Sequence, residues 1–307
     1  MIVLGFDTSN YTTSVAMFDG VQGENRSRLL DVRQGELGLR QSDAVFAHVK
    51  RLPELADALF DGRDRAEIGA IGVSTRPRAV EGSYMPCFLA GVSAARTMAA
   101  ALRVPCYDFS HQQGHIASAL WSANRMDLMQ QPHLAWHLSG GTTELLLVEP
   151  ADRNVTAERI GGTSDISAGQ VIDRAGKLLQ LPFPSGKAMD QLAQQVEKPE
   201  FFKVKTADLS FSFSGLENKA AAYAGVHSPE ETAAYVLESV CNVIIRTTWD
   251  ARKRYPGLPV VFSGGVASNS RLRRNCQIFD PVFAEPALST DNAMGIAVLT
   301  WLQEGTL

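Results

Sequence analysis

The sequence is poor in cysteine, and its cysteines form no closely spaced pair. Cys87, Cys106, Cys241 and Cys276 are scattered over the chain without a C-x-x-C motif. This spacing argues against a disulfide framework and against a zinc knuckle. We therefore expect four reduced thiols that serve as packing residues.

Long apolar runs are also missing. No stretch approaches the ~18 consecutive apolar residues that a membrane helix needs. Residues 1–7 run straight into a polar turn and lack the basic, long-apolar and cleavage regions of a signal peptide. The sequence predicts a cytoplasmic protein that makes no membrane contact.

The chain has no excess of positive charge. Its formal net charge of −4 argues against a protein that coats nucleic acid through bulk charge. A local basic patch and an RNA substrate stay compatible with this balance. With 307 residues, of which 45% are hydrophobic and 20% charged, the chain has an ordinary globular composition and is long enough for two cored lobes.

Two common phosphate-binding motifs are absent. The sequence has no G-x-G-x-x-G, and residues 184–188 (Pro-Ser-Gly-Lys-Ala) lack the first glycine and the final hydroxyl of a P-loop. Instead, turns at 7–9, 139–142 and 263–265 follow apolar strands and offer hydroxyls or unshielded backbone amides. One such turn usually serves only chain reversal. Three of them favour a nucleotide ligand.

The predicted elements repeat along the chain. Strands at 2–6 and 14–18 flank a hydroxyl-rich turn, and strands at 133–138 and 144–149 flank a second small-polar turn. Further strands are predicted at 68–74, 104–109 and 258–262, and helices at 45–60, 89–102, 164–181, 230–254 and 292–303. The repeat predicts two lobes of related topology.

A histidine pair, His111 and His115, follows the predicted strand 104–109. With Ser110 as N-cap, both imidazoles lie on one face of a helix, as two ligands of one metal ion require. Gln112 stands where H-E-x-x-H metalloproteases carry their general-base Glu, so zinc proteolysis is not expected. A pair at this spacing also arises by chance, and the histidines alone leave a packing role open.

Six motifs together resemble one family. Residues 7–9, 111–115, 139–142, 211–216 (Phe-Ser-Phe-Ser-Gly-Leu), 263–269 and 289–292 occur in the order and approximate spacing of the TsaD family, whose earlier names invoked an M22 glycoprotease. The resemblance covers essentially the whole chain. It implies an α/β protein with a two-lobed actin/hexokinase/Hsp70-like (ASKHA) fold built from duplicated mixed-sheet domains. We expect the first lobe over residues 1–131, completed by helix 292–307, and the second over 132–291.

The resemblance also implies an activity and its ligands. TsaD-family enzymes are metal-dependent acyltransferases that move the threonylcarbamoyl group from threonylcarbamoyl-adenylate to N6 of adenosine 37 in tRNA. His111, His115 and Asp291 are the implied ligands of one Fe(2+) or Zn(2+) per subunit. The resemblance also implies an adenylate-type nucleotide as ligand, either threonylcarbamoyl-AMP or ATP. The residues implied to contact it are Leu138, Ser139, Gly140, Gly141, Thr142, Asp173, Gly186, Asp190 and Asn269, and the third turn adds Gly264 and Gly265. Implied partners are the tRNA substrate and TsaB-like and TsaE-like proteins, and a dimer stays open.

The first turn departs from the family pattern. The family usually reads E-T-S-C-D-E-T, and here Tyr11 and Thr12 replace both acidic residues. Asp7 is the carboxylate that remains there, which makes it the candidate catalytic base. Thr142 replaces a family histidine.

Arginines also mark departures. The family's glycine-rich loop T-x-G-P-G-L becomes residues 75–80, which gain Arg76 and Arg78. These arginines could bind a phosphate, or they could lie in a solvated loop without a binding role, and the sequence favours neither. Arg271, Arg273 and Arg274 are expected on exposed helix faces.

Two alternative functions therefore stay open. The chain could be a divergent paralogue that carbamoylates another acceptor. It could also be a non-catalytic, nucleotide-binding scaffold that pairs with a true TsaD.

Overall fold

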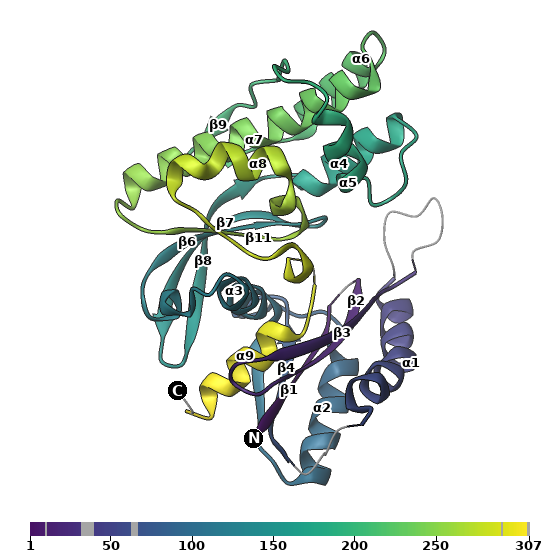
Figure 1. Ribbon diagram of the computed structural model, residues 1–307, viewed down its shortest axis with the longest axis vertical. Helices are drawn as coiled ribbons and strands as arrows, with labels where there is room; N and C mark the ends of the chain where they lie inside the picture. Colours follow the sequence, from purple (N-terminus) through teal and green to yellow (C-terminus); the bar gives the residue numbers. More distant parts are fainter. Residues whose placement is uncertain (10, 32–39, 63–66, 290, 306–307) are drawn as a thin grey trace. The chain divides into compact units, whose positions relative to one another are not determined.

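The computed structural model describes residues 1–9, 11–31, 40–62, 67–289 and 291–305 (Figure 1). The chain divides into two compact units. Unit 1 comprises Met1–Gln131, Glu149–Ala157 and Asp291–Leu307, and unit 2 comprises Pro132–Val148 and Glu158–Thr290. Residues 149–157 belong to unit 1, which the sequence did not indicate. None of the helices in the described ranges combines the length and apolar character that a membrane span requires.

Unit 1 contains a five-stranded mixed sheet with the order β3-β2-β1-β4-β5. Its strands are β1 (Ile2–Thr8), β2 (Thr12–Phe18), β3 (Gly23–Leu29), β4 (Ile68–Arg76) and β5 (Cys106–Ser110). β1, β4 and β5 run parallel to one another, while β2 is antiparallel to both of its neighbours. The carboxyl ends of the three parallel strands therefore meet at one edge of the sheet.

β3 was not predicted. Its residues are mostly polar and exposed, because it is an edge strand that pairs with β2 on one side only. Charged side chains are common on such edges, where they prevent pairing with other chains. The strand is therefore defined by its long-range pairing and carries almost no apolar alternation.

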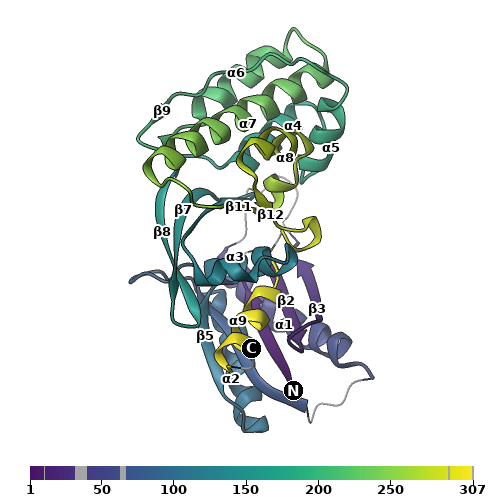
Figure 2. The same cartoon turned by 60° about the vertical axis from the view of Figure 1, so that its left-hand side comes forward.

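Helices cover both faces of the unit 1 sheet (Figure 2). They are α1 (Gln41–Phe60), α2 (Phe88–Leu102), α3 (His111–Ser122) and α9 (Met294–Gln303), with a short 3₁₀ helix at Met126–Gln130. Leu4 and Phe6 share a core cluster with residues of α1 and α2. On the other face, a side chain at Gly5 would collide with the backbone of Ala293 and Ala297, so α9 lies directly on β1.

The predicted helix 45–60 is longer in the structure and passes through Pro53 without ending. Pro53 lies on the exposed side of α1, where water can bond the carbonyl that it leaves unpaired. The final helix starts at Met294, two residues later than predicted.

Unit 2 repeats the strand order of unit 1. Its sheet has the order β12-β11-β6-β7-β8-β10-β9, so the five strands β8-β7-β6-β11-β12 match β3-β2-β1-β4-β5. The bounds are β6 (His133–Leu138), β7 (Thr143–Ala151), β8 (Asn154–Thr163), β9 (Thr206–Ala207), β10 (Ser210–Phe211), β11 (Val260–Ser263) and β12 (Val282–Phe283). The predicted duplication of a mixed-sheet lobe is confirmed.

The helices of unit 2 bury one face of its sheet. They are α4 (Ala168–Leu178), α5 (Gly186–Ala193), α6 (Ser214–Ala224), α7 (Pro229–Arg254) and α8 (Ser270–Asn275), with 3₁₀ turns at Gly265–Ser268, Cys276–Phe279 and Pro286–Leu288. The indole of Trp136 is fully buried and donates to Thr248 Oγ1 of α7 over 2.9 Å. α4 is shorter than the predicted helix 164–181 because a capping box between Ser167 and Gln170 sets its start.

The expectation of exposed arginines after the third turn is wrong for Arg271. Its side chain is buried, and its guanidinium donates to the carbonyls of Ala193 and Val196 and pairs with Glu238. Arg271 thus joins α8 to the end of α5 and to α7, which no local pattern shows.

All four cysteines are free thiols, and Cys87, Cys241 and Cys276 are buried. Burial raises the pKa of Cys87 to about 11 and that of Cys276 to about 12. These thiols therefore stay protonated at neutral pH, as packing residues should.

The crossing of α3 and α9 gives a stability prediction. A methyl group at Gly295 would collide with the Gly114 carbonyl oxygen, which is backbone and cannot move aside. We expect Gly295→Ala to lower the free energy of unfolding by about 1–3 kcal/mol. Gly225→Ala is the control, since its methyl group meets only an ordinary contact with the Ala222 carbonyl. Equal melting temperatures for the two variants would contradict the prediction.

Candidate metal centre and nucleotide-binding turns

The helix that carries both histidines starts where the sequence predicts. Ser110 Oγ accepts a hydrogen bond from the Gln113 amide over 3.2 Å, and Gln113 Oε1 accepts one from the Ser110 amide over 2.9 Å. This capping box confirms Ser110 as N-cap. His111 therefore occupies the first helical position, and His115 lies one turn later on the same face.

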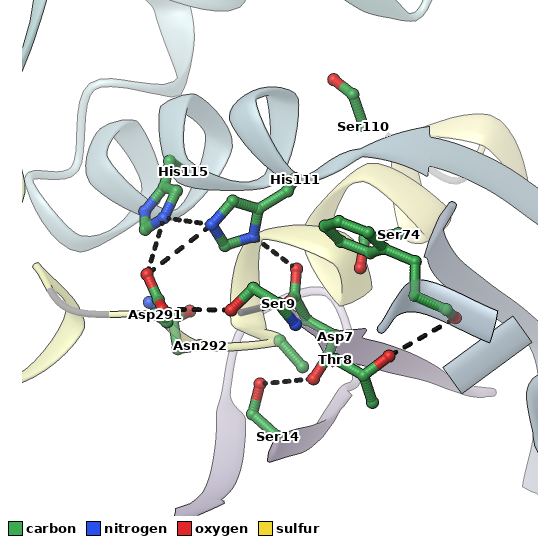
Figure 3. Close-up of polar contacts among 12 residues, drawn as sticks. Asp7, Thr8, Ser9, Ser14, Ser74, Ser110, His111, His115, Asp291 and Asn292 are labelled. Carbon is green, nitrogen blue, oxygen red and sulfur yellow. Dashed lines mark hydrogen bonds and ion pairs between the residues drawn. The ribbon is translucent and has the colours of Figure 1, made fainter. Parts of the chain in front are cut away.

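Asp291, from the segment before α9, meets both histidines (Figure 3). Its Oδ1 lies 3.2 Å from His115 Nε2 and 3.6 Å from His111 Nε2. The two Nε2 atoms are 2.9 Å apart. All three residues belong to unit 1, and their ligand atoms lie within 4.8 Å of one another.

Residues of the first turn hold this cluster in place (Figure 3). Asp7 Oδ2 lies 2.7 Å from His111 Nδ1, and Asp7 Oδ1 accepts the Ser9 amide over 3.0 Å. Ser9 Oγ donates to Asp291 Oδ2 over 3.0 Å. A carboxylate at Nδ1 keeps the proton on that nitrogen and turns the Nε2 lone pair toward the other ligands. The sequence marked Asp7 as the candidate base and included Ser9 in a phosphate-suited turn, but it did not indicate the bond from Ser9 to Asp291.

The buried charges of the cluster depend on one another. Burial alone lowers the pKa of His111, but the Asp7 carboxylate and the hydrogen bonds with Asp291 and Asp7 raise it to about 10. Burial likewise raises the pKa of Asp291, and hydrogen bonds from His111 and His115 hold it well below its usual range. The arrangement of two carboxylates and two imidazoles thus stabilises positive charge at its centre.

The donor set fits a transition metal ion. Two neutral imidazoles and one carboxylate suit Fe(2+) and Zn(2+), with metal–nitrogen distances of about 2.1 Å. The two Nε2 atoms are 2.9 Å apart, so both imidazoles face one point at which a single ion could be bound. The Asp7 carboxylate behind His111 is the outer partner that ligating histidines commonly have.

In unit 2, the turn between β6 and β7 is closed by its own residues. The Ser139 amide donates to the Thr142 carbonyl over 2.8 Å, and the Thr142 amide donates to Ser139 Oγ over 3.0 Å. Gly140 and Gly141 lie exposed at the tip, where an added side chain would meet no atom. The backbone of this turn is therefore open to a ligand.

The third turn lies beside the second. β11 runs parallel to β6, so the last residues of the two strands, Ser263 and Leu138, lie at the same edge of the unit 2 sheet. Gly264 has φ +91°, and a side chain there would collide with the Leu138 backbone. Gly265 is open. Glycine is thus required at 264 for both conformation and space.

Of the four further predicted residues in unit 2, two are bonded to each other. Asn269, the N-cap of α8, donates from Nδ2 to Asp190 Oδ1 over 2.8 Å. Asp173 Oδ1 accepts the Ser185 amide over 2.7 Å, directly before Gly186, and burial raises the pKa of Asp173. Asp190 also lines a cavity of about 330 Å³ with Gln194, Val196, Glu197, Ser270, Arg271 and Arg274.

Asp165 is a structural residue that the sequence did not assign. It accepts hydrogen bonds from the hydroxyls of Ser212, Ser214 and Thr163 and from the amides of Phe213 and Ser214. One carboxylate therefore fixes the Phe-Ser-Phe-Ser motif at the start of α6. The sequence held a signal, because the hydroxyls of a serine-rich segment before a helix need a hydrogen-bond acceptor. Since that acceptor lies about fifty residues upstream, the local sequence does not identify it.

The comparisons with known proteins now bear on this site. The family model described as "tRNA N6-adenosine threonylcarbamoyltransferase" matches residues 33–298. The chain belongs to the TsaD family. Two relatives of that same name, from Sulfurihydrogenibium sp. (strain YO3AOP1) and Syntrophus aciditrophicus (strain SB), are each 31% identical over 97% of this chain and cover 89% and 91% of their own lengths.

Solved structures support the fold. Full-length HypF in its phosphate- and nucleotide-bound form is similar with a TM-score of 0.62 and 14% identity, over 99% of this chain and 46% of that one. The ROK hexokinase from Thermus thermophilus aligns over 99% of both chains with a TM-score of 0.52 and 15% identity. The predicted ASKHA fold is thus confirmed. Membership of the TsaD family further implies a divalent metal and a nucleotide-type ligand.

The contact between Asp7 and His111 predicts how metal affinity changes. We expect Asp7→Asn to weaken binding of Fe(2+) or Zn(2+) by about 10- to 100-fold, as loss of an outer carboxylate partner does. His115→Ala should abolish stoichiometric binding. Titration against a competing chelator, with metal content by mass spectrometry, measures both. Asp57→Asn, an exposed carboxylate on α1, is the matched control. Wild-type affinity in Asp7→Asn would refute the assigned contact.

The bonds to Asp165 predict a pH-dependent stability difference. Burial raises the pKa of Asp165, but the hydroxyls of Ser212 and Ser214 outweigh this and hold it below its usual range. A lowered folded-state pKa stabilises the protein above the unfolded value near 3.8, and this contribution is lost as pH falls through the folded value.

Because the Asp165 side chain is exposed, screening limits its contribution, and we expect Asp165→Asn to cost about 1 kcal/mol at pH 7. The difference from wild type should shrink below about pH 4. Urea unfolding at several pH values measures it. A difference that grows with acidity would contradict the assignment.

Proposed function

We propose that this protein transfers the threonylcarbamoyl group from threonylcarbamoyl-adenylate to N6 of adenosine 37 in tRNA. The observation that supports this most directly is the meeting of His111, His115 and Asp291, from two segments far apart in the chain, where His115 is buried and the other two are half-buried. A family member that had lost the reaction would have no evident need for an intact ligand set. This argues against the scaffold alternative.

The residues of unit 2 bind the adenylate in this proposal. Amides at the tips of the two turns, at Gly140, Gly141 and Gly265, hold the phosphate. Ser139 and Thr142 close the first turn, and Leu138 lies at its base. Asp173, Gly186, Asp190 and Asn269 bind the nucleoside portion. Two of these residues, Asp190 and Asn269, are already bonded to each other, so the nucleoside meets a preorganised surface.

The reaction is a nucleophilic substitution at the carbamoyl carbon. The N6 amine of adenosine bonds to that carbon, the bond from carbon to the phosphate oxygen breaks, AMP leaves, and the amine loses one proton. His111, His115 and Asp291 would hold the metal, which when bound would supply positive charge to offset negative charge on the substrate. The main work of the chain is positioning and charge neutralisation.

Asp7 has a defined place in this scheme. It is almost fully buried, at 1% exposure, and both of its oxygens accept hydrogen bonds. We propose that it orients His111, and that a role as proton acceptor would require it to exchange one of these bonds. Thr12 is buried in β2 and Tyr11 is half-buried, and neither side chain supplies a carboxylate.

We also extend three expectations to this chain. The two units correspond to the two lobes of the family fold. The metal is Fe(2+) or Zn(2+). TsaB-like and TsaE-like proteins act with the enzyme, as the family resemblance implies.

Reconstitution tests the function. Wild-type protein, loaded with Fe(2+) or Zn(2+) and supplied with threonylcarbamoyl-adenylate and unmodified tRNA, should form threonylcarbamoyladenosine, measured by mass spectrometry of the digested nucleosides. Asp291→Asn should lose at least about 100-fold in rate if metal charge stabilises the transition state, and Asp57→Asn should retain wild-type rate. The assay is repeated with TsaB-like and TsaE-like proteins added, so that an activity that requires these partners is also detected.

Two results would reject the proposal. Tight adenylate binding with no transfer to tRNA under any of these conditions would favour the scaffold. Transfer to a small-molecule amine with no dependence on tRNA would favour the alternative carbamoyltransferase.

A further inference from the structure

The loop between β4 and α2 is anchored at the metal centre but has no role in the mechanism above. Arg76, the last residue of β4, pairs with Ser110, the residue before His111. The next carbonyl, of Pro77, accepts the Gln112 amide of α3 over 3.0 Å. The loop therefore starts beside the helix that carries both histidines, within unit 1.

The loop is also closed by its own hydrogen bonds. The Arg78 amide donates to Ser83 Oγ over 3.0 Å, and the Ser83 amide donates to the Val80 carbonyl over 3.2 Å. Gly82 supplies the left-handed conformation, with φ +74°, that this reversal needs. The backbone of a loop fixed in this way has little entropy left to lose on binding.

Those side chains have an unusual composition. Tyr84 and Val80 are 63% and 55% exposed, and Arg76 and Arg78 are exposed as well. Arg76 makes no side-chain hydrogen bond or ion pair with any residue in the described ranges, whereas Arg96 of α2 is paired with Asp108 of β5. Glu81 is the acidic residue of the loop.

A guanidinium without a partner among the described residues and an exposed phenol ring, carried by one loop, match one kind of ligand. Arginine binds phosphate, and aromatic rings stack on bases that are not paired in a helix. A protein with net charge −4 needs such a local contact to hold a polyanion. A small-molecule acceptor would make no use of a ring exposed outside the buried metal cluster.

We propose that residues 76–86 bind the single-stranded loop of the RNA substrate, with Arg76 contacting a backbone phosphate and Tyr84 stacking on an unpaired base. The inference rests on the proposed function in that the acceptor is RNA. It adds the surface that selects and positions this acceptor beside the metal ligands.

The test combines RNA binding with kinetics. Binding of an unmodified anticodon stem–loop RNA is measured by fluorescence anisotropy at several salt concentrations, for wild type, Arg76→Ala, Tyr84→Ala and Tyr84→Phe. Lys50→Ala and Phe46→Ala are matched controls, since they remove an exposed charge and an exposed ring from α1. Metal content and melting temperature should equal wild type in all variants.

We expect Arg76→Ala to reduce the slope of log affinity against log salt by about 0.7 to 1. Tyr84→Ala should weaken binding by about 5- to 100-fold, and Tyr84→Phe should restore it. In the transfer reaction, KM for tRNA should rise in Arg76→Ala while KM for threonylcarbamoyl-adenylate stays unchanged.

Three outcomes would overturn the inference. The first is that the wild-type protein does not bind the RNA. The second is that the loop variants bind the RNA as tightly as the α1 controls do. The third is that Arg76→Ala raises KM for the adenylate alone, which would assign Arg76 to the adenylate phosphate. Failure of the proposed function is distinguishable, because it shows as absent transfer even where wild-type protein binds the RNA through Arg76 and Tyr84.

Discussion

The bond between the Asp7 carboxylate and the His111 ring connects the end of the first strand to the helix that carries the histidine pair. A buried carboxylate is costly unless donors satisfy it, and Asp7 is satisfied by His111 and by the Ser9 amide. The Ser9 hydroxyl then reaches Asp291. The first turn of the chain thus orients two of the three candidate metal ligands, although it provides none of them.

The position of the third ligand depends on small residues. α9 begins three residues after Asp291 and crosses α3 where Gly295 meets the Gly114 carbonyl. On its other side the same segment lies on Gly5 of β1. Larger side chains at these glycines would move α9 outward by ångströms, and a metal site tolerates far less than that. The close backbone approach therefore helps to position the candidate metal ligands.

The two units share one strand order but differ in what their first turns present. In both, parallel strands end together at one edge of a sheet, where turns gather. In unit 1 the turn after β1 contributes side chains, Asp7 and Ser9, which suit a cation site. In unit 2 the turn after β6 contributes open backbone at Gly140 and Gly141, which suits an anion. Beside Tyr11 and Thr12, Asp7 keeps both of its oxygens bonded, one to His111 and one to the Ser9 amide.

The sequence by itself determined the apolar strands, the cap at Ser110 and the helical spacing of the histidines, because these follow from neighbours a few residues apart. The order of its motifs determined the family and hence the duplicated fold. The tertiary structure alone decided the edge strand β3, the burial of Arg271, the five bonds to Asp165 and the bridge from Ser9 to Asp291. Each of these joins residues that are distant in the chain or depends on strand pairing, and local propensity carries no information about which distant partner satisfies a buried polar group.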